Sequence, residues 1–156
     1  MEINPDLLAP CGLYCGVCAV RMATVSGNEK FKERLVAVYQ PISDRPLTTA
    51  DIQCGGCLSS NTFLFCKVCP VKDCVKQRKI EGCHQCGDFP CSFVENFPIP
   101  VGKAVIQRAI PYWREHGTAK YVTDEEARYI CPECGNKLFR GAKRCNQCKV
   151  EVAVYL

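Results

Sequence analysis

The stretch CGGCLSSNTFLFCKVCPVKDCVKQRKIEGCHQCGDFPC, residues 54–91, contains eight of the 15 cysteines in the chain. Most of these cysteines form pairs with two residues between them. This spacing allows one tight turn to direct two sulfurs at a single ion. A disulfide between such close cysteines forms only in special turns, mostly in redox enzymes. The stretch therefore predicts a fold that is organised by bound metal.

Cysteines continue on both sides of this stretch. They make up about a tenth of the 156 residues, a level at which cysteine itself is expected to shape the fold. All of them are candidate metal ligands: Cys11, Cys15, Cys18, Cys54, Cys57, Cys66, Cys69, Cys74, Cys83, Cys86, Cys91, Cys131, Cys134, Cys145 and Cys148.

The last four cysteines give the strongest signal. Cys131-x2-Cys134 and Cys145-x2-Cys148 resemble the two knuckles of a zinc ribbon, in which β-hairpin tips supply a tetrahedral four-thiolate site. Strands are expected at Lys137–Arg140 and at Val150–Leu156. Zinc is the predicted metal, and rubredoxin-like iron is the alternative because it accepts the same ligands.

The middle cysteines can be divided in two ways. Grouping neighbours in sequence gives one site of Cys54, Cys57, Cys66 and Cys69, and another of Cys74, Cys83, Cys86 and Cys91. Cross-bracing, in which alternate pairs share an ion, fits the spacing equally well. We expect about four zinc ions in all, or three if one cysteine group holds none.

The N-terminal triple, Cys11-x3-Cys15-x2-Cys18, lacks a fourth ligand in its own segment. Its spacing resembles the cluster loop of radical S-adenosylmethionine enzymes, which would make it an iron–sulfur or catalytic centre. Those enzymes need a large α/β barrel of roughly 200 residues or more, and Val17 replaces their usual aromatic residue. The alternative is a structural zinc completed by another residue, for which His84 is one candidate.

Local patterns predict several helices. Asn28 caps a helix at Glu29–Gln40, and others are expected at Val71–Ile80, Pro90–Asn96 and Gly102–His116. Pro111 should kink the last of these and Gly117 should end it. A Thr123/Glu126 capping box predicts a further short helix. Together these patterns indicate a small, metal-organised α+β fold: residues 1–117 form a cysteine-rich helical domain, and residues 118–156 form a β zinc ribbon.

Other features bear on location and partners. The N-terminus has no signal-peptide pattern and no segment resembles a membrane span, so we expect reduced thiols, a cytoplasmic protein and no membrane partner. The formal charge of +4 is no argument for nucleic acid, because metal ligation deprotonates thiols. Basic residues gather around Phe139 in the tail and favour either nucleic-acid contact or a solvated face: Lys137, Arg140, Lys143, Arg144 and Lys149.

Two aromatic residues, Tyr112 and Trp113, fit the core better than a partner groove. Motifs of metalloproteases, of serine hydrolases and of phosphate-binding loops are missing from the sequence, so a non-enzymatic role is favoured.

Three segments together resemble a cysteine-rich family, domain of unknown function 3795. They are Pro10-CGLYCGVC-Ala19, Cys54-Gly-Gly-Cys57, and Cys83-x2-Cys86-Gly-Asp-Phe-Pro90-Cys91. The resemblance implies a small metal-binding protein of prokaryotic type with a zinc-ribbon-like tail and no established activity. The sequence as a whole predicts a zinc-binding protein with mainly structural metals that acts as a protein or nucleic-acid interaction module.

Overall fold

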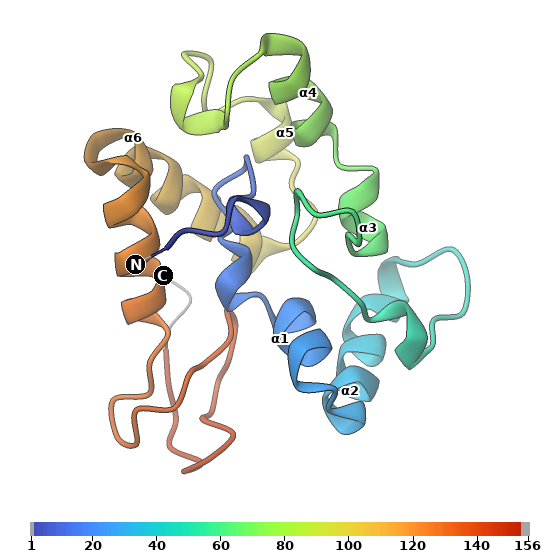
Figure 1. Ribbon diagram of the computed structural model, residues 1–156. Helices are drawn as coiled ribbons and strands as arrows, with labels where there is room; N and C mark the ends of the chain where they lie inside the picture. The colour runs from blue at the N-terminus through green and yellow to red at the C-terminus, as the bar shows by residue number, and fades with distance from the viewer. Residues whose placement is uncertain (1, 154–156) are drawn as a thin grey trace.

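Helices form most of the regular structure in the computed structural model, which describes residues 2–153 (Figure 1). Short 3-10 turns separate them at η1 (Pro5–Leu7), η2 (Cys15–Val17), η3 (Gln40–Ile42), η4 (Thr49–Asp51) and η5 (Cys83–Gln85). The α-helices are α1 (Ala19–Ser26), α2 (Glu29–Tyr39), α3 (Leu64–Lys67), α4 (Pro70–Arg78), α5 (Ser92–Glu95) and α6 (Pro100–Arg128).

The expected α+β class with a C-terminal β ribbon is wrong. The described part of the chain contains no sheet, and in the tail the β pairing consists of two isolated bridges, Ile130 with Lys137 and Arg144 with Glu151. The strand expected at Lys137–Arg140 does not form. The one expected at Val150–Leu156 is also missing from its described part, and residues 154–156 lie outside the described residues.

The segment expected as the first tail strand divides its backbone bonds between two neighbours. The Leu138 N–H donates to the Tyr129 carbonyl at 2.8 Å, whereas the Arg140 N–H donates to the Val17 carbonyl of the N-terminal cysteine loop at 2.8 Å. The phenyl ring of Phe139 packs against Phe31 of α2, with ring centroids 5.1 Å apart. Pairing within the tail is thus limited to short stretches, and the rest of this segment contacts the body of the molecule.

Local capping explains the α1–α2 pair. Gly27 takes a left-handed conformation with φ of 63° and ends α1, as glycine commonly does. The Asn28 side chain then accepts a hydrogen bond from the Phe31 N–H at 3.0 Å and starts α2. The predicted helix at Glu29–Gln40 is thus confirmed to within one residue at its C-terminal end.

The longest helix, α6, consists of two segments that meet at Gly117. Only this residue leaves helical geometry within α6, with φ of 79° and ψ of 168°. The bend therefore falls at Gly117 and not at the expected Pro111. The Thr123 hydroxyl donates to the Ala119 carbonyl inside the second segment, so Thr123 is not the predicted N-cap. The helix starts earlier than the capping-box pattern suggested.

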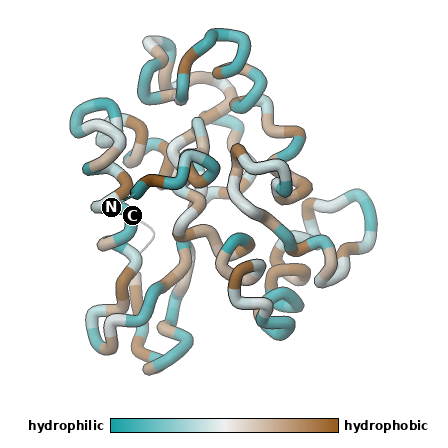
Figure 2. Tube along the Cα trace, viewed as in Figure 1, coloured by the Kyte–Doolittle hydropathy of each residue, from teal (hydrophilic) through white to brown (hydrophobic). Residues whose placement is uncertain are grey.

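The main core joins α6 to the first cysteine loop. Val105, Ile106 and Ile110 of α6 are fully buried, and Tyr14 and Val17 of the loop belong to the same cluster. A second cluster lies between α1, α2 and the segment 52–63, where Ile52 and Phe63 are buried. The outer loops of the molecule are largely hydrophilic (Figure 2).

The tail also shares in the main core, through Leu138 and Ala142. The Tyr14 hydroxyl donates to Glu126 of α6 at 2.8 Å, and the Tyr121 hydroxyl donates to the Gly12 carbonyl at 2.7 Å. These bonds hold the first cysteine loop against the second segment of α6. The division into domains at residue 117 stays a prediction.

Candidate metal centres

The four tail cysteines converge on one point. The sulfur atoms of Cys131, Cys134, Cys145 and Cys148 all lie within 4.8 Å of one another. The sulfurs of Cys131 and Cys148 are 3.6 Å apart, as are those of Cys134 and Cys145. Four thiolates at about 2.3 Å from a tetrahedral zinc ion stand about 3.8 Å apart, so the observed spacing fits a single ion.

Each half of this site uses the same backbone hydrogen bonds, offset by 14 residues. The Cys131 N–H donates to the Asn136 carbonyl at 2.8 Å, and the Cys145 N–H donates to the Val150 carbonyl at 2.9 Å. The residue after each pair, Gly135 or Lys149, has a positive φ of 73° or 67°. The two halves are therefore matching metal knuckles, as the cysteine spacing predicts.

Backbone N–H groups prepare one of these thiols for ligation. The N–H groups of Cys148 and Gln147 point at the Cys145 sulfur, and these hydrogen bonds lower the pKa of Cys145 from 9.0 to about 6. The Gln147 nitrogen lies 3.4 Å from that sulfur. A thiolate is the form that binds metal, so these N–H groups favour the metal-binding form of Cys145.

A second group of cysteines surrounds η2. Mutual electrostatic interactions of the thiols connect the N-terminal triple with both pairs from the 54–69 segment: Cys11, Cys15, Cys18, Cys54, Cys57, Cys66 and Cys69. The Cys57 N–H donates to the Cys15 sulfur at 3.4 Å. Burial, together with the nearby thiols of Cys18 and Cys54, raises the pKa of Cys66 to about 12.

These interactions mix segments that are far apart in the sequence. Burial raises the pKa of Cys11 to about 12, and Cys69 and Cys15 contribute to that shift. The triple therefore shares its surroundings with cysteines from both later pairs. Ligation of metal by these seven cysteines stays a prediction.

The N-terminal triple lacks the scaffold of the enzymes whose cluster loop it resembles. Residues 2–153 contain no barrel strand, and the triple instead lies in a loop and 3-10 turn before α1. The spacing of these three cysteines is therefore its main likeness to radical S-adenosylmethionine enzymes.

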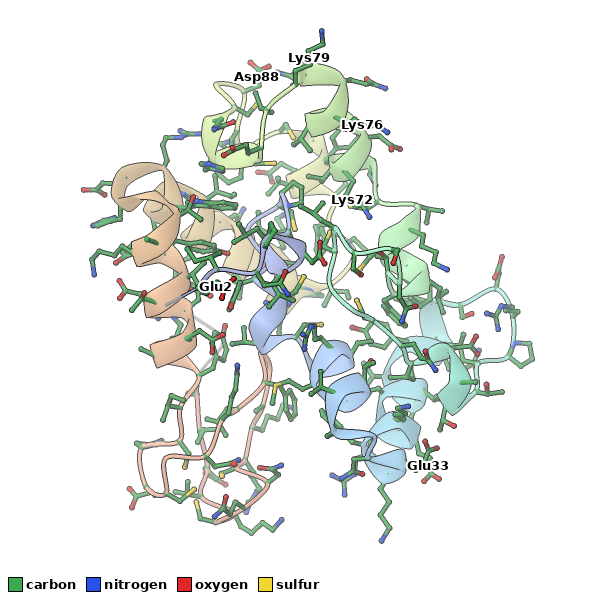
Figure 3. The ribbon with its side chains drawn as sticks, in the orientation of Figure 1. Glu2, Glu33, Lys72, Lys76, Lys79 and Asp88 are labelled. Atoms are coloured by element: carbon green, nitrogen blue, oxygen red, sulfur yellow. The ribbon has the colours of Figure 1, made fainter. Side chains whose placement is uncertain are left out.

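The third group, Cys74, Cys83, Cys86 and Cys91, lines one cavity between α4 and the segment leading to α5. In the described part of the chain, the tail cysteines are the one set of three or more candidate ligands whose donor atoms all lie within 4.8 Å of one another. Figure 3 shows sulfur atoms in the middle of the molecule as well as in the tail.

Sequence reasoning missed two arginines beside these thiols. Arg140 was assigned to a basic patch, but its guanidinium donates to the Tyr14 carbonyl at 3.1 Å, and its charge offsets part of the rise in pKa that burial causes at Cys11 and Cys15. Arg78 donates to the Cys86 sulfur at 3.6 Å. The Arg140 contact joins residues 126 positions apart, so no local pattern could have identified it.

Other basic residues of the tail are also engaged. The Lys137 ammonium pairs with Glu126 at 2.7 Å, and Arg144 pairs with Glu151 at 2.9 Å. The Lys149 ammonium donates to the Asn146 carbonyl. Much of the positive charge around Phe139 is thus used in contacts within the chain.

The core assignment of Trp113 is confirmed. Its ring lies between His84, at a centroid distance of 3.8 Å, and Tyr121, at 4.6 Å, and both pairs are stacked. Only 2% of Trp113 is exposed. His84, the suggested completing ligand for the triple, is therefore part of an aromatic stack, and burial lowers its pKa.

Comparison with known proteins gives one family. No curated protein and no solved structure matches the chain significantly. Among residues 2–153, no helix combines the length and the apolar character that crossing a membrane requires. The match to the family described as Protein of unknown function (DUF3795) spans residues 7–96, more than half of the chain, and so includes the triple and all the cysteines of the 54–91 stretch. The chain therefore belongs to this family, and it carries a four-cysteine tail beyond the matched region that is compatible with a zinc-ribbon-like site.

Proposed function

We propose that this protein binds zinc through Cys131, Cys134, Cys145 and Cys148, that this zinc is structural, and that the protein acts by binding another protein. The observation that carries the metal assignment is the convergence of four sulfurs, two pairs of which are 3.6 Å apart. Zinc suits these ligands because it favours four thiolates in a tetrahedron.

The scarcity of regular structure within the tail supports a structural role for the zinc. The regular structure of the tail consists of two isolated bridges in the described residues. A structural zinc contributes about 10–16 kcal/mol in small zinc-finger peptides, whereas the net stability of a whole domain is about 5–15 kcal/mol. One ion is thus sufficient to account for an ordered tail.

The charge distribution of the tail supports a protein partner. Phosphate contacts need basic side chains that are free to reach a nucleic acid. In the tail, Lys137 and Arg144 are held in ion pairs, and Arg140 is directed toward the N-terminal cysteines. This arrangement favours a protein partner over a nucleic acid. The proposed location is the cytoplasm, where thiols stay reduced and available for metal.

Elemental analysis of the purified full chain tests the metal assignment. The Cys134→Ser variant should contain one zinc fewer than the wild type, because an exposed tail ligand is lost while the N-terminal cysteines stay intact. An unchanged zinc content in this variant would refute the assignment. Iron in place of zinc at this site would support the rubredoxin-like alternative.

Binding to labelled single-stranded RNA and DNA at low salt, followed by fluorescence anisotropy, tests the partner class. We expect no binding. Salt-sensitive binding that is lost in a Lys143→Ala, Lys149→Ala double variant would show that the partner is a nucleic acid.

A further inference from the structure

The third group of cysteines lines a cavity beside α4, whereas the tail cysteines converge on a single point. The cavity has a volume of about 170 Å³. One water molecule occupies about 30 Å³ in the liquid, so the cavity is several times larger than the space that one water molecule or one metal ion fills. All four cysteines of the third group line it: Cys74, Cys83, Cys86 and Cys91.

A single zinc ion does not explain a cavity of this size. Four thiolates close around zinc until their sulfurs are about 3.8 Å apart. The tail cysteines have this geometry, with pairs at 3.6 Å. Among the described residues, the sulfurs of the cavity cysteines do not all lie within 4.8 Å of one another, in contrast to those of the tail cysteines.

A four-iron cluster does fit this arrangement. In such a cluster an iron–sulfide core separates the four cysteine thiolates, so the ligands surround a volume rather than a point. The cavity supplies four thiols around a shared space, and its other walls include the apolar side chains of Val71, Val75, Ile80 and Phe89. Apolar walls limit solvent access, which is one of the factors that set the reduction potential of a cluster.

One arginine lines the cavity, and a second contacts the backbone of the loop that bears two of its cysteines. The Arg78 guanidinium donates to the Cys86 sulfur at 3.6 Å and to the Asp88 carboxylate at 2.8 Å. Arg114 of α6 donates to the His84 carbonyl at 2.8 Å and to the Cys86 carbonyl at 2.7 Å. Arg114 fixes the loop that bears Cys83 and Cys86, and Arg78 offsets the negative charge of thiolates.

We propose that Cys74, Cys83, Cys86 and Cys91 hold a [4Fe–4S] cluster in this cavity, in place of the third zinc ion that the sequence suggests. This assignment is independent of the zinc site in the tail. The protein would then carry two kinds of metal centre, one structural and one able to accept an electron.

The test uses the full chain, produced with iron supplementation and purified without oxygen. Iron, acid-labile sulfide and zinc are measured per chain in the wild type and in Cys91→Ala and Cys74→Ala. Each variant should lose about four irons and four sulfides and should keep its zinc. Cys134→Ser is the matched control, and it should lose zinc and keep its iron. Dithionite should reduce the wild-type cluster by one electron and produce an electron paramagnetic resonance signal.

Two results would overturn the proposal. One is loss of about one zinc from Cys91→Ala with no change in iron, and the other is an iron content that neither variant changes. If both variants fail to fold, as judged by near-ultraviolet circular dichroism of the buried Trp113, Arg78→Gln provides a second test. It keeps every ligand and removes a positive charge, so the iron content should be unchanged and the reduction potential should become more negative. A wild-type potential in Arg78→Gln would also contradict the proposal.

Discussion

Gly56 lies where the Cys54–Cys57 turn passes closest to the N-terminal segment. Its φ is 130°, and a Cβ atom added there would stand 2.4 Å from the Asp6 carbonyl oxygen. That oxygen also accepts the Leu58 N–H at 3.1 Å, so the two segments are tied together at this point. Only glycine allows both the close approach and the backbone conformation.

We predict that Gly56→Ala lowers the free energy of unfolding by about 2–4 kcal/mol, because a backbone clash adds to the conformational strain. Urea denaturation measures the change. Gly87→Ala is the matched control, since a Cβ at Gly87 would meet nothing within 4 Å. Equal stabilities of the two variants would contradict this account of Gly56.

At Lys79 we predict a substitution that stabilises the protein, in contrast to Gly56→Ala. This exposed lysine ends α4 in the left-handed conformation, with φ of 56°. A residue with a Cβ pays about 1–2 kcal/mol for that conformation, and glycine avoids the cost at the expense of some unfolded-state entropy. Lys79→Gly should therefore stabilise the protein by about 0.5–1 kcal/mol. A lower thermal midpoint in Lys79→Gly than in the wild type would be inconsistent with strain at this cap.

At the scale of the elements, a buried ion pair joins the two segments of α6. Only 1% of Glu125 in the second segment is exposed. Its carboxylate accepts hydrogen bonds from Arg108 of the first segment, one of them at 3.2 Å, and lies 3.6 Å from the Arg128 guanidinium. The bend at Gly117 thus brings opposite charges together inside the helix pair.

Replacing Arg108 alone should lower the free energy of unfolding more than replacing Arg108 and Glu125 together. We predict that Arg108→Met lowers the free energy of unfolding by about 3–5 kcal/mol, because Glu125 then keeps a buried charge with a weaker partner set. Combining this change with Glu125→Gln should restore part of the loss. Chemical denaturation of the single and double variants gives the coupling, and strictly additive effects would exclude a direct pair.

Elements that depend on local signals were the predictable part of this fold. The Asn28 cap and the break at Gly117 follow from neighbouring residues, and the structure has both. The β ribbon was expected because cysteine knuckles commonly lie on hairpins. The structure has only two bridges there, and the Arg140 N–H bonds to Val17 instead of extending the pairing, a contact that no short window of sequence reveals.

At the scale of the whole molecule, the candidate sites also differ in how far local sequence predicts them. The tail site was predictable because all four ligands lie within 18 residues, and its spacing alone defines the geometry. The grouping of the N-terminal cysteines was left open because it depends on how the chain folds back. The approach of Cys57 to Cys15 shows that segments 42 residues apart contribute to one region.

Metal removal should affect the tail first. Addition of a strong chelator should release the zinc and expose the Cys131 and Cys145 amides, which donate to Asn136 and Val150 within the knuckles. Hydrogen exchange is the suitable measurement, because a tail with two bridges and no sheet contributes little to circular dichroism. We expect fast exchange of both amides after chelation and slow exchange before it.

The α2 amides serve as the internal control, since this helix has its own cap and core cluster. Tail amides that remain protected after complete removal of zinc would show that the metal is not structural.

The 14-residue match between the two knuckles has a mechanical consequence. Each knuckle provides two sulfurs, so neither can complete a tetrahedron by itself, and the loop around Gly141 is the covalent link that connects them. If a protease cut this loop while the ion was bound, the two fragments would stay associated, because each fragment would still coordinate the ion through two sulfurs. Removal of the ion would take away this connection between the two fragments.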